Sequence, residues 1–179
     1  MNNHRRQRLF VRPSTLRQGH RLDHNDVGYG LFGGPYRNGD VIATFRGVKI
    51  TCDEYKERQD LGMGDYGIEV GGRSPYVLDC REEAVIHNRC LASMANDPAE
   101  GNGDNDINGL ACWAAIDDGV AVRARANSFV RVEGGIARLI AGRPDEEGFE
   151  DKTQFAITGT QEILWSYRGD FFIRRDFFL

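Results

Sequence analysis

Short apolar runs alternate with glycine-rich or polar turns along most of the chain. Segments 40–50 (DVIATFRGVKI), 65–70 (DYGIEV) and 75–80 (PYVLDC) are rich in β-branched and aromatic residues, which is typical of strands. Three further runs of this kind follow in the second half of the chain, at residues 127–142, 153–160 and 162–167. Many short strands, abundant glycine and few helical stretches predict a mainly β fold.

Two segments favour short helices. Thr51 is followed three residues later by Glu54, which is the capping-box pattern that satisfies the amides of a first helical turn. Segment 88–96 (NRCLASMAN) predicts one or two helical turns, with Leu91 and Met94 on one face. We therefore expect one helix directly after Thr51 and a second, shorter one before Asn96.

Two other segments interrupt this pattern. Residues 97–110 (DPAEGNGDNDINGL) predict a long polar loop, which inside a compact domain is either functional or mobile. Residues 111–126 contain enough apolar residues to pack locally. The chain ends in RGDFFIRRDFFL, with four phenylalanines that call for a packing partner or a role.

Length and composition fit one globular domain. The chain has 179 residues, of which 40% are hydrophobic, and this length provides one sizeable core but is short for two domains. It contains neither an apolar stretch of about 20 residues nor a signal-peptide core, so we expect an intracellular protein of the nucleus or the cytoplasm.

Cysteine and histidine spacing does not indicate a metal site. The four cysteines stand singly, with no CxxC pair, and the four histidines have no ligand spacing. We expect no metal, and we expect the cysteines to be buried free thiols, at positions Cys52, Cys80, Cys90 and Cys112.

Charge is unevenly distributed. Residues 1–22 hold six arginines and no acidic residue, whereas the rest of the chain holds the other 17 of its 23 basic residues against 27 acidic ones. An acidic body favours a basic macromolecular partner, and a basic arm can contact the phosphates of a nucleic acid. Short basic tails are common, however, which favours the alternative that the arm is a partly disordered, soluble tail.

Gly28, Gly30 and Gly33 have the GxGxxG spacing of dinucleotide-binding folds. That motif requires a buried strand before the glycines and a helix that opens on them. Here a polar stretch precedes the glycines, and a turn around Pro35 and then strand-like residues follow them. The spacing therefore does not indicate a Rossmann phosphate site.

Three separated segments together resemble the SET-domain family, in the same order. VGYGLF…NGDVIATFRG is similar to the opening of a SET domain, YVLDC…NRCLASMAND to its middle, and TGTQEILWSYRGDFF to its end. The resemblance covers residues 26–172, apart from an insertion at about 98–126. It implies a SET-domain fold of several small sheets of short strands, with few short helices and a C-terminal pseudoknot, over residues 23–179 after the basic N-terminal arm 1–22.

The resemblance implies an S-adenosylmethionine-dependent protein-lysine N-methyltransferase that acts on a basic protein segment, with a histone tail as one candidate. In the family, the glycine turn receives the cofactor, an asparagine holds it, and a tyrosine hydroxyl lies near the transferred methyl group. The implied cofactor-binding residues are Gly28, Tyr29, Gly30, Asn96, Asp97 and Tyr167. The implied catalytic residues are Tyr167 and Tyr66, and the implied lysine channel comprises Tyr66, Tyr76, Trp165 and Phe172.

The chain departs from the family pattern at several points. Asp97 stands where the family has histidine, and Asn127, in the place of a second family asparagine, comes about thirty residues late because of the insertion. The cysteine clusters that flank many family members are absent from this sequence. The C-terminal phenylalanines either complete the channel or pack into the core or a homodimer contact.

A second interpretation belongs to a different class of protein. A non-catalytic SET-like module would bind a protein, or a nucleic acid through its arginine-rich arm, and the replaced histidine and the insertion favour it. The glycine turn, Asn96 and Tyr167 favour the enzyme. Cofactor binding distinguishes the two.

Overall fold

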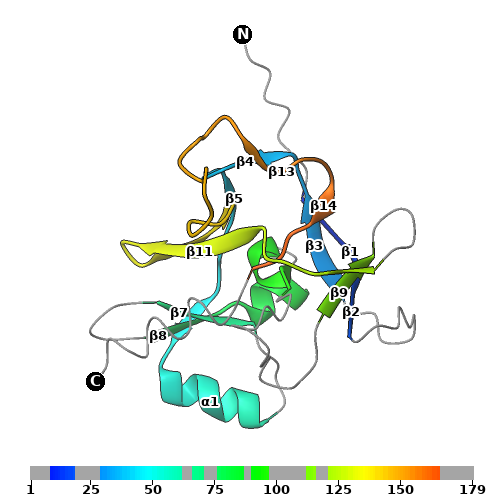
Figure 1. Ribbon diagram of the computed structural model, residues 1–179. Helices are drawn as coiled ribbons and strands as arrows, with labels where there is room; N and C mark the ends of the chain where they lie inside the picture. The colour runs from blue at the N-terminus through cyan, green and yellow to red at the C-terminus, as the bar shows by residue number, and fades with distance from the viewer. Residues whose placement is uncertain are drawn as a thin grey trace.

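The computed structural model describes residues 9–18, 29–61, 66–70, 76–86, 90–96, 112–115 and 121–165. These residues form five small antiparallel sheets around a common core, with few short helices (Figure 1). The predicted mainly β class is confirmed. None of the helices among these residues has the length and apolar character needed to cross a membrane.

Two of the sheets contain the first strands of the chain. The first has the order β1-β3-β14, formed by Phe10–Pro13, Tyr29–Gly33 and Gln161–Glu162. The second has the order β10-β9-β2, formed by Ala121–Arg123, Cys112–Ala115 and Leu16–Gln18. Figure 1 shows β2 and β9 beside β1 and β3.

The other three sheets make up the rest of the described fold. One has the order β11-β12-β5, formed by Ser128–Glu133, Ile136–Ala141 and Val41–Thr44. Another has the order β6-β8-β7, formed by Val48–Ile50, Tyr76–Asp79 and Gly67–Val70. The last is the pair β13-β4, formed by Phe155–Ile157 and Tyr36–Arg37. The strand-like runs of the sequence thus coincide with strands β5 to β8 and β11 to β13.

The helices also follow the sequence signals. Helix α1 spans Cys52–Asp60, and its capping box is confirmed, because Thr51 Oγ1 accepts from the Glu54 amide at 3.1 Å and Glu54 accepts from the Thr51 amide at 2.7 Å. A π-helical turn, η1, covers Glu82–Ile86. The expected turns before Asn96 form a 3₁₀ helix, η2, over Leu91–Met94.

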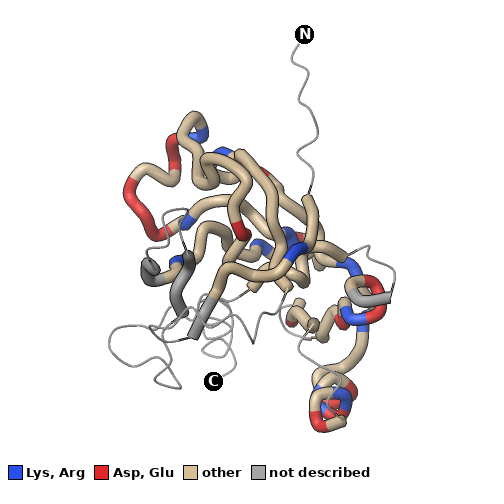
Figure 2. The backbone as a smooth tube through the Cα atoms, turned by 90° about the vertical axis from the view of Figure 1, so that its right-hand side faces the viewer, with Lys and Arg blue, Asp and Glu red and all other residues tan. Residues whose placement is uncertain are grey.

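Helix α1 buries none of its side chains. Figure 2 shows it at the edge of the molecule, with acidic and basic positions around it. An ion pair of 2.5 Å between Arg58 and the buried Asp79 attaches it to β8, and the Tyr55 hydroxyl accepts a hydrogen bond of 2.9 Å from the Gly67 amide of β7. Polar contacts rather than apolar burial therefore hold this helix in place.

The core is formed where β3, β12, β7, β8 and η2 meet. Its largest fully buried side chains include Phe32, Leu31, Leu139 and Ile157. Each such side chain contributes about 1.5–3 kcal/mol by removal from water. Ile163, just after β14, is also fully buried and donates its amide to the Leu31 carbonyl at 2.7 Å, which brings the segment 161–165 into the core.

Parts of the predicted arm and the predicted insertion are strands of this fold. Residues 10–13 of the arm pair with β3, and residues 16–18 pair with residues 112–114 of the insertion. The described part of the arm is thus a pair of strands and not a disordered tail. The predicted polar loop at 97–110 lies outside the described residues.

Candidate functional site

The carboxylate of Glu162 is the centre of a buried polar cluster. Only 6% of this residue is exposed. Its Oε2 accepts hydrogen bonds from the amide and the hydroxyl of Thr15, both at 2.6 Å, and its Oε1 accepts from the Ser14 hydroxyl at 2.6 Å and from Asn96 Nδ2 at 3.0 Å. A buried carboxylate requires such a set of donors, because without them its desolvation would be strongly unfavourable.

Asn96 joins this cluster to the glycine turn. It follows η2, and its Nδ2 donates both to Glu162 and to the carbonyl of Tyr29, the latter at 3.2 Å. The Asn96 carbonyl accepts the amide of Trp165 at 3.0 Å. No described residue donates to Asn96 Oδ1.

Gly30 makes room for the Glu162 carboxylate. A Cβ added at Gly30 would overlap Glu162 Oε1 and would lie 3.0 Å from Asn96 Nδ2. Only glycine allows this approach. The family resemblance implies that the glycine turn admits a ligand, whereas here the side of the turn at Gly30 is filled by a side chain of the protein itself.

Asn127 fixes the segment that carries Glu162. Its Nδ2 donates to the Glu162 carbonyl at 2.8 Å, and its Oδ1 accepts from the Leu164 amide at 2.9 Å. Residues 164 and 165 also form isolated parallel bridges, to Asn96 on one side and to Ser128 on the other. The segment 161–165 therefore runs between the chain at residue 96 and the chain at residues 127–128.

The structure brings three of the predicted cofactor residues together. Tyr29, Gly30 and Asn96 are neighbours through the contacts above, and the side chain of Tyr29 is 61% exposed. The other predicted cofactor residues, Gly28, Asp97 and Tyr167, lie outside the described residues. So does Phe172, which was predicted for the lysine channel.

The predicted channel tyrosines share one face of the β7-β8 hairpin. Val70 pairs with Tyr76, and the Cys80 amide donates to the Tyr66 carbonyl, so alternation places both tyrosines on the side that packs against the core. Lys49 Nζ lies 3.7 Å from the centroid of the Tyr76 ring. Trp165 belongs to the same core cluster, is 9% exposed and packs edge-on against Phe45 with centroids 6.1 Å apart.

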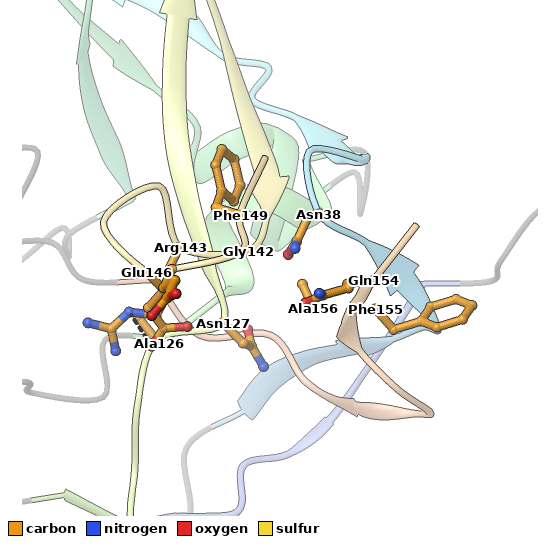
Figure 3. A pocket seen from close by; sticks show the side chains of 11 residues that line it. Asn38, Ala126, Asn127, Gly142, Arg143, Glu146, Phe149, Gln154, Phe155 and Ala156 are labelled. Atoms are coloured by element: carbon orange, nitrogen blue, oxygen red, sulfur yellow. Dashed lines mark ion pairs between the residues drawn. The ribbon is translucent and has the colours of Figure 1, made fainter. Parts of the chain in front are cut away.

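Asn127, whose side chain binds the Glu162 segment, also lines a polar pocket of about 200 Å³. Asn38 and Gln154 face it from one side and Arg143 with Glu146 from the other (Figure 3). Arg143 forms ion pairs of 3.3 Å with both Asp145 and Glu146. Two charged side chains of the pocket lining, Arg143 and Glu146, thus pair with each other.

Two thiols, those of Cys80 and Cys90, lie together in the core at the start of η2. Cys80 and Cys90 are both fully buried, and Cys90 Sγ accepts the Arg46 amide at 3.1 Å. The Cys80 thiol donates to the Leu78 carbonyl at 3.4 Å. Its interaction with the Cys90 sulfur lowers the pKa of Cys90 to about 6, and the same interaction together with burial raises the pKa of Cys80 above its usual range. Buried free thiols were expected at both positions, but Cys52 is exposed and that expectation was wrong there, because it lies on the polar helix α1.

Comparison with protein-family models and with curated proteins finds no match for this chain. Among the described residues, no group of three histidine, cysteine, aspartate or glutamate side chains is placed to hold a metal ion.

Sequence reasoning aligned Glu162 with the glutamate of the family's C-terminal motif but gave it no role, and it missed the partners of Glu162 in the arm. Glu162 lies in the segment that resembles the end of a SET domain, so its motif position was a usable signal. Ser14 and Thr15 carry no signal of their own, since their role depends on a carboxylate 147 and 148 residues away.

Proposed function

We propose that this protein is an S-adenosylmethionine-dependent protein-lysine N-methyltransferase of the SET-domain type. One observation carries the proposal. The three segments that resemble the family are far apart in the sequence, yet Tyr29 and Gly30, Asn96, and residues 161–165 lie in mutual contact. That is the arrangement the family resemblance requires of a cofactor site beside a threaded C-terminal segment.

The residues around Asn96 suit this cofactor. S-adenosylmethionine carries an ammonium group, and Asn96 Oδ1 is an acceptor that no described residue uses. The exposed Tyr29 offers an aromatic ring and main-chain groups beside it. Asp97 and Tyr167, which the resemblance adds to this surface, would complete it.

When bound, S-adenosylmethionine supplies a methyl group that a neutral lysine amine accepts by in-line displacement. A free lysine has a pKa of about 10.4, so the protein must favour the neutral amine. An aromatic channel does so by desolvation, which disfavours the ammonium. Tyr66, Tyr76 and Trp165 would line that channel, and the Tyr167 hydroxyl would orient the amine. Alignment of the reactants can then lower the barrier by about 7–11 kcal/mol.

The substrate would be a basic protein segment, with a histone tail as one candidate. The chain has a net charge of −4, and this charge is concentrated outside the basic arm. Acidic side chains next to the proposed channel, such as Glu69 on β7, would attract lysine-rich peptides. A peptide can bind to an exposed sheet edge through its main chain while one pocket selects the lysine.

The first experiment is a calorimetric titration of the protein with S-adenosylmethionine, beside a Tyr29→Ala, Asn96→Ala double variant. Micromolar binding that the variant loses would support the cofactor site, and a screen of basic peptides for methyl transfer would follow. No binding at millimolar cofactor would contradict the proposal.

That second result would favour a non-catalytic SET-like module that binds a protein, or a nucleic acid through its basic arm. One observation favours this alternative. The Glu162 carboxylate, held by Ser14 and Thr15, occupies the side of the glycine turn that Gly30 leaves open.

A further inference from the structure

We propose that Glu162 is a positioning residue that joins the N-terminal segment to the cofactor-binding surface. Cofactor binding would then depend on Ser14 and Thr15, although neither contacts the cofactor or the substrate. The inference rests on the proposed function, and it adds a segment to the site that neither the motifs nor the family resemblance includes.

The carboxylate is a bridge between two parts of the chain. Among the described residues, only the turn donates to Oε2, through the amide and the hydroxyl of Thr15. Oε1 is shared between that turn and Asn96. Hydrogen bonds to an ionised acceptor are about twice as strong as neutral ones, so the carboxylate binds both parts of the chain strongly.

The turn between β1 and β2 is arranged to donate to the carboxylate. The Ser14 hydroxyl accepts the Leu16 amide at 3.0 Å, which leaves its own proton directed to Glu162. Strand β1 is held beside β3 by the pairing of Arg12 with Gly30, and the Arg12 guanidinium lies 3.9 Å from the centroid of Phe32. The N-terminal segment is thus anchored directly before the turn.

Beyond the carboxylate, the chain of contacts reaches the proposed cofactor surface. Asn96 Nδ2 donates to both the Glu162 carboxylate and the Tyr29 carbonyl, and so links the two. These two bonds determine how the amide is rotated and therefore where Oδ1 points. Without the Glu162 carboxylate, Asn96 Nδ2 would lose one of its two acceptors, and Thr15 would lose the acceptor that its amide and its hydroxyl share.

The carboxylate also fills the space at Gly30, so it fixes this wall of the site by contact as well as by charge. The described part of the insertion joins the same unit, because β9 pairs with β2 directly after the turn. Loosening residues 14–15 would therefore disturb Tyr29, Asn96 and β9 together.

The experiment compares Glu162→Gln and Thr15→Val with two exposed controls, Glu150→Gln and Thr153→Val. Thr153 also donates its hydroxyl to a carboxylate, at 2.6 Å to Asp151, but far along the chain from the cluster. Two quantities are measured: the Kd for S-adenosylmethionine by calorimetry, and amide hydrogen exchange of peptides that cover residues 9–18 and 29–33.

We expect Glu162→Gln to raise the Kd at least about tenfold and Thr15→Val at least about threefold, because each weakens charge-assisted bonds. Exchange should become faster in both peptides for both variants, while the controls match the wild type. Thr15→Val keeps the result interpretable if Glu162→Gln does not fold.

Other results separate the two proposals. Faster exchange in residues 9–18 with an unchanged Kd would overturn the positioning role and leave the proposed function standing. A wild-type protein that does not bind S-adenosylmethionine would refute the proposed function and the cofactor dependence of this inference. In that case, unchanged exchange in residues 29–33 of the variants would also refute the joining role of Glu162.

Discussion

A hydrogen bond of 3.0 Å joins Asn96 Nδ2 to the carboxylate of Glu162, although 66 residues separate them in the sequence. This bond connects the chain just after η2 to β14. A second bond of Asn96 Nδ2, to the Tyr29 carbonyl, connects the same part of the chain to the glycine turn. The cluster is therefore sensitive to small changes at any of these three places.

Gly30→Ala should destabilise the protein by about 1–3 kcal/mol, because the added methyl group would overlap the Glu162 carboxylate and displace it. Gly159→Ala is a matched control, since an added Cβ there meets nothing within 4 Å. Urea denaturation measures both variants. Equal stability of the two would contradict the packing described for Gly30.

Asn127→Ala should cost about 1–3 kcal/mol in the free energy of unfolding, because it leaves the Glu162 carbonyl and the Leu164 amide without their side-chain partner. Asn38→Ala is a suitable control, since Asn38 is also partly buried but its bonds to main-chain carbonyls are long, at 3.3 and 3.4 Å. A similar loss in both variants would argue against a special role of Asn127 in holding the C-terminal segment.

Tyr167→Phe should retain cofactor binding and lose most of the turnover, because only the hydroxyl that orients the lysine amine is removed. Calorimetry with S-adenosylmethionine and a methyl-transfer assay on a basic peptide separate the two effects. Unchanged turnover would refute the role assigned to this tyrosine.

The Cys80–Cys90 pair should make stability depend on pH. The pKa of Cys90 is lowered to about 6 in the folded protein, against about 8.5 for a free thiol, so its contribution to stability is lost as the pH falls from 8.5 through 6. The pKa of Cys80 is raised, so its contribution is lost as the pH rises above about 8.5. Stability from this pair should therefore increase between pH 6 and about 8.5 and decrease above it.

Ultraviolet absorbance of the thiolate, titrated with pH, tests this directly. Cys80→Ala removes the strongest donor to the Cys90 sulfur and should raise the pKa of Cys90. Cys52→Ala removes an exposed thiol on α1 and should leave the Cys90 titration unchanged. A Cys90 titration that is the same in all three proteins would show that the two thiols do not interact.

The local elements could be predicted because their signals lie within a few residues of one another. The capping box at Thr51 and Glu54, and the alternation around Ile68 and Val70, depend on contacts that the sequence places nearby. The glycine turn could also be singled out, but the family resemblance suggested a ligand there and gave no indication that Glu162 lies against Gly30.

By itself, the sequence determined the mainly β class, the positions of strands β5 to β8 and β11 to β13, and the helix after Thr51, since backbone preference and hydrophobic period are local properties. Only the tertiary structure decided that Thr15 of the basic arm, Asn96 and Glu162 share one buried cluster, and that the arm pairs with the insertion through β2 and β9. The physical reason is that a buried carboxylate takes its donors from whichever segments the packed core brings to it, and no local pattern records those partners.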